Sequence, residues 1–154
     1  MNISVKEARQ IKTVTLTDCM VTLDEFIAVV KFGAKLEFSQ QMIDAVNANH
    51  ALLDKFLEEG RIIYGVTTGF GENVRYVIPP EEAKTLQRNI VRSHACAVGE
   101  PLDREQARAV MLMTILNAGK GHSGIRIGTL DLIRKMLNLD LIPFAPSEGS
   151  VGYL

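Results

Sequence analysis

The sequence is poor in the features that mark several common classes of protein. Two cysteines in 154 residues cannot build a disulfide scaffold, and Cys19 and Cys96 lack metal-site spacing. Seventeen Lys and Arg against 18 Asp and Glu leave a net charge of −1, which exerts little long-range attraction on nucleic acid or anionic lipid. No apolar run approaches the roughly 18–20 residues that span a bilayer, and no secretory signal opens the chain. We therefore expect a cytoplasmic protein with no metal, membrane or nucleic-acid partner.

The remaining composition is that of a folded protein. Hydrophobic residues make up 47% and charged residues 23% of the chain, and the length fits one domain over residues 1–154. Alternation predicts strands at 13–17 and 35–38, which may pair with each other. Apolar residues at helical spacing predict helices at about 22–31, 39–60, 80–99, 107–118 and 130–139, while 141–150 reads as extended loop. The expected fold is mainly α, with a small β element near the N-terminus.

Short-range signals mark the ends of these helices. Capping boxes are predicted where a side-chain acceptor precedes an acid or amide by three residues, and glycines that follow a helical pattern suit the left-handed C-terminal position. Thr22 with Glu25 is the predicted capping box, Ser39 and Asp103-Arg-Glu-Gln106 are further cap candidates, and the glycines are Gly33, Gly60 and Gly99. The helix at 107–118 is so apolar that we expect it to be buried on most sides, either inside this chain or between chains.

A glycine-rich loop follows the apolar pair Ile62-Ile63. It reads Tyr-Gly-Val-Thr-Thr-Gly-Phe-Gly over residues 64–71, and its glycines permit sharp turns and close approach of the backbone to another group. On this pattern alone, a strand end with a tight turn is favoured over a catalytic loop. A phosphate cradle is excluded because the lysine and serine or threonine of that motif are missing.

Polar groups also interrupt the apolar face of the helix at 80–99. His94 lies three and four residues after apolar positions, and a lone histidine there is more often a core residue than a ligand. Adjacent Ser93 and His94 should project about 100° apart, which is the wrong geometry for a serine–base pair. Cys96 is expected to be a small core residue.

Two more glycine-rich segments occur later in the chain. Residues 119–126, Gly-Lys-Gly-His-Ser-Gly-Ile-Arg, form either a helix connector or an anion site at the next helix N-terminus. Residues 146–152, Pro-Ser-Glu-Gly-Ser-Val-Gly, precede Tyr153 and Leu154, where the sequence stops inside a loop without a closing element. We therefore expect the chain to be part of a longer protein.

Four motifs together resemble those of the aromatic amino acid ammonia-lyase family, above all those of histidine ammonia-lyase. They lie at 64–71, at 86–89 with Ser93-His94, at 121–126 and at 149–152. They stand in the order of that family and at about its spacing. The resemblance covers nearly the whole chain and implies its largely helical fold. It also implies elimination of ammonia from histidine, phenylalanine or tyrosine to give an arylacrylate, in a homo-oligomer that builds each active site from several subunits.

The resemblance also assigns roles to residues. It makes Tyr64 the candidate base for the β-proton, and an ordinary phenol, which titrates at about pH 10, needs positive surroundings to act so at neutral pH. It places His94, with Ser93 and Gly71, against the substrate. The loop-shaping positions that it implies are Gly65, Gly69, Phe70, Gly124 and Arg126.

Two departures from the family pattern bear on activity. The family usually has Asn where this chain has Thr67, and Thr offers no amide. The family uses no external cofactor but an internal methylidene-imidazolone ring, made from Ala-Ser-Gly. Tyr153 and Leu154 stand at the alanine and serine positions, so the chain as written lacks the hydroxyl that must leave and should be inactive alone. A degenerate member that binds a ligand or partner without elimination, and a plain assembly domain, are the alternatives.

Overall fold

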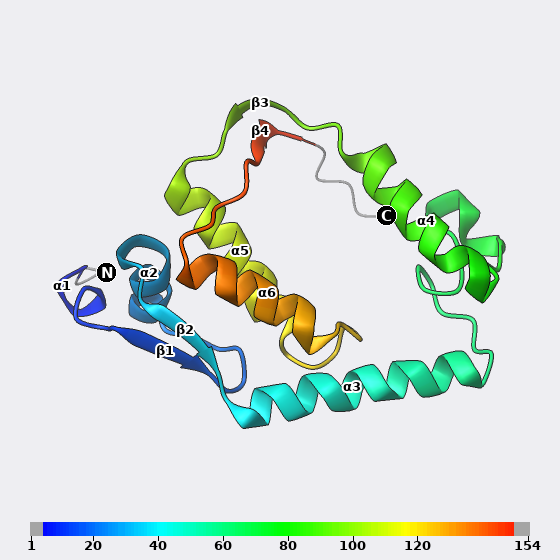
Figure 1. Cartoon of the computed structure of the whole chain (residues 1–154), viewed down its shortest axis with the longest axis horizontal. Helices are drawn as coiled ribbons and strands as arrows, with labels where there is room; N and C mark the ends of the chain where they lie inside the picture. The colour runs from blue at the N-terminus through cyan, green and yellow to red at the C-terminus, as the bar shows by residue number, and fades with distance from the viewer. Residues whose placement is uncertain (1–4, 150–154) are drawn as a thin grey trace. The chain divides into compact units, whose positions relative to one another are not determined.

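The computed structural model describes residues 5–149 and divides into two compact units, shown in Figure 1. The first unit comprises residues 1–53 and 102–145, and the second comprises 54–101 and 146–154. Compact units need not fold separately, so the single domain over 1–154 stays a prediction. Across the described residues, no helix is both long enough and apolar enough to cross a bilayer.

The first unit opens with the small β element that the sequence predicts. After the short α1 (Val5–Ala8), strand β1 (Thr13–Leu16), helix α2 (Leu23–Phe32) and strand β2 (Lys35–Phe38) form a β-α-β unit. The two strands pair in parallel, with Thr13 opposite Lys35 and Leu16 opposite Phe38. The free edge of β2 is satisfied by a side chain: Leu36 N–H donates to Asn138 Oδ1, and Asn138 Nδ2 donates to the Leu36 carbonyl, both at 2.9 Å.

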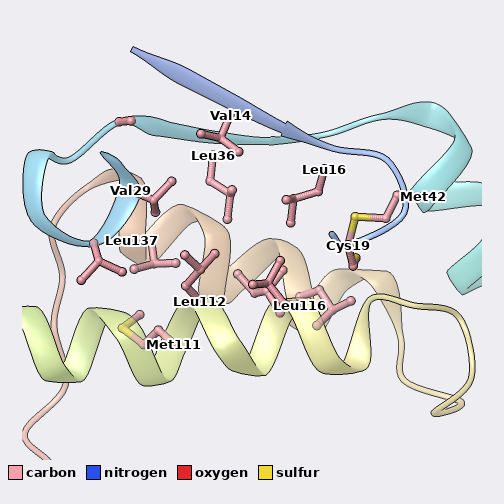
Figure 2. Packing of buried hydrophobic residues seen from close by; sticks show 14 of the residues in the cluster. Val14, Leu16, Cys19, Val29, Leu36, Met42, Met111, Leu112, Leu116 and Leu137 are labelled. Carbon is pink, nitrogen blue, oxygen red and sulfur yellow. The ribbon is translucent and has the colours of Figure 1, made fainter. Parts of the chain in front are cut away.

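Three longer helices complete this unit: α3 (Gln40–Glu58), whose last residues pass into the second unit, α5 (Arg104–Ala118) and α6 (Ile127–Asn138). Their apolar faces meet the strands in one core (Figure 2). Its labelled members are Val14, Leu16, Cys19, Val29, Leu36, Met42, Met111, Leu112, Leu116 and Leu137. Helix α5 is not buried on most sides within this chain, because Val110 and Met113 are 56% and 52% exposed. Burial of α5 between chains stays a prediction.

The predicted helix caps are confirmed. Thr22 Oγ1 accepts from Glu25 N–H, Asp103 accepts from Gln106 N–H at 2.8 Å, and both boxes are closed by the reciprocal bond. Ser39 Oγ accepts from Met42 N–H at 3.2 Å. Helices α2 and α3 are followed by left-handed glycines, Gly33 at φ +69° and Gly60 at φ +68°.

The buried guanidinium of Arg108 joins three elements of the first unit. It is 1% exposed and donates to the carbonyls of Val29 and Val30 at the end of α2, at 2.7 and 3.0 Å, and to Leu137 near the end of α6, at 2.9 Å. It also donates to Asp140 at 2.9 Å. The last carbonyls of a helix have no partner within the helix, so this side chain supplies donors to two helix ends. The sequence analysis did not single it out, because one Arg in an apolar stretch carries no local signal.

The second unit contains the short 3₁₀ helix η1 (Gly71–Arg75), α4 (Pro80–His94), and strands β3 (Val98–Pro101) and β4 (Pro146–Glu148), which pair antiparallel. Two expectations are corrected here. Helix α4 ends at His94 rather than near Gly99, which instead lies in β3 at φ +89°, where a Cβ would be 3.1 Å from Glu148. Residues 146–148 form strand β4 rather than a loop, because β3, which is distant in the sequence, supplies the strand with which they pair.

Candidate functional site

The second half of the glycine-rich loop at 64–71 begins a segment that backbone hydrogen bonds close at its base. Gly69 N–H donates to the Tyr76 carbonyl at 3.1 Å, and Ile78 N–H donates to the Thr67 carbonyl at 2.8 Å. Between them, Thr68 forms an isolated antiparallel bridge with Val77. Residues 70–75, which lie between these anchors, therefore leave and return at one point in the manner of a compact surface loop, and Tyr64 and Gly65 precede this closed segment.

Two threonine hydroxyls hold the loop from inside. Thr68 is 1% exposed, accepts from Gly65 N–H at 3.2 Å and donates to the Gly69 carbonyl at 2.9 Å. Thr67 Oγ1 accepts from Ile63 N–H at 2.8 Å and lies 3.1 Å from the Arg61 carbonyl, to which it donates. At the position where the family usually has Asn, this chain therefore has a hydroxyl that closes the preceding turn.

The glycines of this loop are required for different reasons. Gly65 has φ +71°, and a Cβ there would lie 2.7 Å from the Phe70 ring. A Cβ on Gly69 would lie 2.7 Å from the Asn73 carbonyl oxygen in η1. Gly71 has φ +54° but open space around it, so its requirement is conformational only.

Tyr64 presents its ring at the surface of this loop. The side chain is 48% exposed and packs edge-on against Phe70, with the ring centroids 5.8 Å apart and the planes at 75°. The N–H of Gly71 donates to the Tyr64 hydroxyl oxygen at 3.1 Å. The phenol is therefore positioned by Phe70 and Gly71 of its own loop, and the Tyr64 side chain remains half-exposed.

Ser93 and His94 lie in the last turn of α4 and are exposed. The expected divergence of their side chains is wrong: Ser93 Oγ and His94 Nδ1 are 2.9 Å apart. Both side chains fold back to the Ile90 carbonyl, at 3.1 Å from Ser93 Oγ and 2.9 Å from His94 Nδ1. His94 is not a core residue, and neither is Cys96, which is exposed because α4 ends before it.

A cavity of about 460 Å³ lies in the second unit behind the glycine-rich loop. Neither Tyr64 nor His94 lines it. Its walls are mostly apolar, from Leu57, Gly60, Arg61, Ile62, Gly65, Val66, Thr67, Val77, Ile78, Ala83 and Gln87. The Arg61 guanidinium already has partners within the protein: it stacks on the Phe56 ring at 4.0 Å and forms an ion pair with Glu59 at 2.7 Å.

The segment 119–126 lies in the first unit and is a tightly held connector. Gly124, at φ +67°, donates its N–H to Asn49 Oδ1 at 2.7 Å, and its carbonyl lies 2.8 Å from His50 Nδ1. Asn49 and His50 are polar residues within the apolar face of α3, a sequence signal that could have indicated this contact but was not used to predict it. Arg126 is exposed and stands at the N-cap of α6 without a side-chain cap bond.

Other reactive groups are few in the described part of the chain. Burial, with the nearby Asp18 charge, raises the pKa of the Cys19 thiol, which disfavours the reactive thiolate. Over residues 5–149, no group of three or more His, Cys, Asp or Glu side chains could hold a metal ion. Tyr153 and Leu154 lie outside the described residues.

The order of these motifs, together with this fold, is matched by known proteins. A profile of the aromatic amino acid lyase family matches residues 21–153. The chain belongs to the aromatic amino acid lyase family. The resemblance expected from the motifs is therefore confirmed, as is the mainly α fold.

Individual members of the family are similar to this chain in sequence or in structure. Histidine ammonia-lyase of Streptococcus gordonii is 42% identical over 132 residues, which are 86% of this chain and 26% of that protein. The crystal structure of histidine ammonia-lyase from Trypanosoma cruzi matches with a TM-score of 0.77 at 36% identity, over 91% of this chain and 27% of that one. Tyrosine aminomutase from Streptomyces globisporus matches with a TM-score of 0.84 at 28% identity, over 90% and 26%. The chain thus spans about a quarter of the length of these relatives.

Proposed function

We propose that this chain is the part of an aromatic amino acid ammonia-lyase that supplies Tyr64 and His94, and that the whole enzyme eliminates ammonia from histidine or a related aromatic amino acid. The observation that carries the proposal is the Tyr64 hydroxyl. Its oxygen accepts from Gly71 N–H at 3.1 Å, its ring packs against Phe70 and is half-exposed, and its loop lies within the residues that the lyase profile matches. The product is the arylacrylate, and the amino group leaves as ammonia.

In this proposal each residue of the site has a defined task. Tyr64 takes the β-proton of the bound amino acid as general base, and the Gly71 N–H positions its oxygen. His94, with Ser93 and Gly71, contacts the substrate. Gly65, Gly69 and Phe70 shape the loop that presents Tyr64, while Gly124 and Arg126 shape the connector before α6. Homo-oligomerisation and a cytoplasmic location are parts of the same proposal.

The internal ring expected for the family supplies the electrophile that binds the amino acid. The residues present do not fit it. Leucine at position 154 carries no hydroxyl, and Tyr153 stands in the alanine position. No step of the reaction is therefore derived through the ring for the chain as written, and the isolated 154 residues should form no arylacrylate.

The test places residues 5–149 of this chain into Streptococcus gordonii histidine ammonia-lyase, in exchange for the matching segment. We expect the chimera to convert histidine to the arylacrylate, followed by its ultraviolet absorbance. Tyr64→Phe in the chimera should lower kcat by about 100-fold or more, the usual contribution of a general base.

Tyr76→Phe is the matched control, because Tyr76 belongs to the same unit and is 55% exposed. This variant should stay within about twofold of the parent chimera, since one exposed hydroxyl is removed without loss of a reacting group. Equal losses for Tyr64→Phe and Tyr76→Phe, or a folded chimera without activity, would refute the proposal.

Tyr153 and Leu154 favour a second candidate, a degenerate member that binds an aromatic amino acid or a partner without elimination. This candidate predicts that the isolated chain shows histidine-dependent chemical-shift changes around His94 and forms no product. The assembly-domain alternative draws on the exposed Val110 and Met113 of α5, and it predicts self-association that light scattering detects.

A further inference from the structure

Two cavities of the first unit adjoin each other at the end of β1. One, of about 360 Å³, is lined by polar groups from the residues after β1, from the start of α3 and from the connector between α5 and α6. The other, of about 450 Å³, has mostly apolar walls from α2 and α5. Met20 and Lys120 line both cavities, so a single small ligand can occupy the two together.

Two glycines of the connector bring these walls together. A Cβ on Gly119 would lie 2.7 Å from Cys19 Sγ and 2.5 Å from Met42 Cε, which are core side chains that lie close together in Figure 2. Gly121 has φ +75°, and a Cβ there would lie 3.1 Å from the Ala45 carbonyl oxygen. Close packing therefore fixes the connector at both glycines, so the cavities are formed before any ligand binds.

The polar cavity offers hydrogen-bonding groups that the protein itself does not use. Asp18 also lines it and uses only Oδ1, which accepts from Met20 N–H at 3.0 Å. Four further side chains of the lining form no hydrogen bond or ion pair with another described residue, namely those of Thr17, Gln41, Lys120 and His122. A ligand therefore meets an ammonium cation, neutral polar groups and a free carboxylate oxygen within one cavity.

The charges of this cavity indicate the class of ligand. The Lys120 ammonium attracts a carboxylate, and the positive end of the α3 dipole, at Gln41, adds to this attraction. Asp18 repels a phosphate or a dicarboxylate but attracts an ammonium group. A small molecule that carries one carboxylate and one ammonium group, as an α-amino acid does, therefore matches the cavity.

The second cavity indicates what the rest of this ligand should be. Its apolar walls would exclude water around a hydrocarbon side chain, which is the main source of affinity in such a cavity. Each of the two volumes is of the size that holds a small molecule. The apolar wall residues are Val21, Leu23, Phe26, Met113 and Leu116.

We propose that the adjoining cavities bind a free α-amino acid with an apolar side chain. Its carboxylate meets Lys120, its ammonium group meets Asp18, and its side chain enters the cavity lined by α2 and α5. The site lies in the first unit, whereas Tyr64 and His94 belong to the second, so the proposal is independent of the proposed function. It gives a task to the polar residues of the connector at 119–126, for which the sequence left a connector and an anion site open.

Titration of the complete 154-residue chain with L-leucine, followed by nitrogen-15 NMR, tests the site. Leucine has no aromatic ring, so it is not a substrate of the proposed enzyme. We expect saturable shifts of the backbone amide signals of residues 17–20, 41–45 and 119–122, with a Kd in the millimolar range that is usual for so small a ligand. Shifts that do not saturate, or that occur only elsewhere in the chain, overturn the proposal.

Four probes separate the charges of the ligand from its side chain. 4-Methylpentanoate lacks the ammonium group, leucinamide lacks the carboxylate, and glycine lacks the side chain. Each should bind more weakly than leucine, and glycine by at least about tenfold because it buries no hydrocarbon. Inorganic phosphate should not displace leucine. Displacement by phosphate, or a probe that binds as tightly as leucine, refutes the assignment of the ligand.

Lys120→Gln and Asp18→Asn test the two charged contacts. Lys120→Gln should weaken leucine binding by about three- to tenfold, the size of one charged hydrogen bond at a partly exposed site, and should leave leucinamide binding unchanged. Asp18→Asn keeps an oxygen that can accept from Met20 N–H, so its turn is preserved. It should weaken leucine binding to a similar extent and should not weaken that of 4-methylpentanoate.

Lys35→Gln is the matched control for the lysine variant. Lys35 is exposed, belongs to the same unit and lines neither cavity, so leucine binding should stay within about twofold of the parent. Equal affinities of Lys120→Gln and Lys35→Gln for leucine overturn the proposal. The activity of the chimera decides the proposed function separately, because leucine binding and elimination are measured in different units of the chain.

Discussion

Replacing Arg108 should cost more stability than replacing any exposed residue of the first unit. In Arg108→Ala the carbonyls of Val29, Val30 and Leu137 lose the donors that now reach them at 2.7–3.0 Å. Because the site is 1% exposed in the intact protein, solvent cannot readily replace those donors. The perturbation therefore frays the ends of α2 and α6 together.

The expected loss of unfolding free energy in Arg108→Ala is the balance of two opposing contributions. Hydrogen bonds to a charged group contribute about 1.5–3 kcal/mol each, but burying the guanidinium has its own cost. Burial and the neighbouring Arg104 lower the pKa of Arg108, while Asp140 opposes this. The net loss on removing one partner from such a buried network is about 3–5 kcal/mol, a large part of the about 5–15 kcal/mol that holds a typical protein folded.

Urea unfolding followed by circular dichroism measures this loss. The matched control is Arg104→Ala, because Arg104 binds the same Asp140, at 2.8 Å, from the same helix but with a half-exposed side chain. This exposed pair should contribute less than about 1 kcal/mol. If the two variants lose the same free energy of unfolding, the reasoning that Arg108 caps two helix ends is refuted.

Arg108→Met separates the carbonyl bonds from the burial of charge. It fills most of the volume with an apolar side chain, and if the cost of burying the ion dominates, stability stays level or rises. If unpartnered carbonyls dominate, the variant loses about 2–4 kcal/mol even without a cavity. We expect the loss, and an unchanged or increased free energy of unfolding would contradict it.

Two further outcomes follow from the described geometry. Hydrogen bonds from Arg104, aided by Arg108, hold the pKa of Asp140 below its ordinary range. The Asp140 carboxylate therefore stabilises the fold fully above its unfolded pKa of about 3.9, and this stabilisation is lost as the pH falls through the folded pKa. The difference in unfolding free energy between the parent and Asp140→Asn, measured by urea unfolding, should be constant above about pH 5 and should disappear in stronger acid. Gly69→Ala should lose about 1–3 kcal/mol, because its Cβ would lie 2.7 Å from the Asn73 backbone carbonyl oxygen. Gly33→Ala, at φ +69° in open space, should lose only about 1 kcal/mol. Thermal melts that rank the two variants in reverse would disprove the clash.

Local signals in the sequence predicted most of the helices and their ends. The capping boxes at Thr22 and Asp103 involve residues three positions apart, so no distant contact was needed to foresee them. The same holds for the left-handed Gly33 and Gly60. Gly99 failed because a glycine pattern cannot distinguish a helix end from the irregular pairing of two strands.

The residues of the candidate site likewise include some that local motifs predicted and some that depend on the tertiary fold. The motif at 64–71 identified Tyr64 and the glycines, but not the buried Thr68 hydroxyl, whose partners depend on how the loop folds back. The prediction that the side chains of Ser93 and His94 diverge was also wrong. Helix geometry gives only the direction of each Cα–Cβ bond, whereas both side chains bend toward the same Ile90 carbonyl.

By itself the sequence determined most of the helices, their caps, the two strands near the N-terminus and the lyase family, since each depends on residues a few positions apart or on motif order. The parallel direction of the strand pair was not predicted and comes from the structure. Tertiary structure alone decided the pairing of Val98–Pro101 with Pro146–Glu148, the contact of Gly124 with Asn49, and the burial of Arg108 among carbonyls of α2 and α6. These contacts join segments tens of residues apart, and their free energy comes from excluding water around groups whose partners no local pattern specifies.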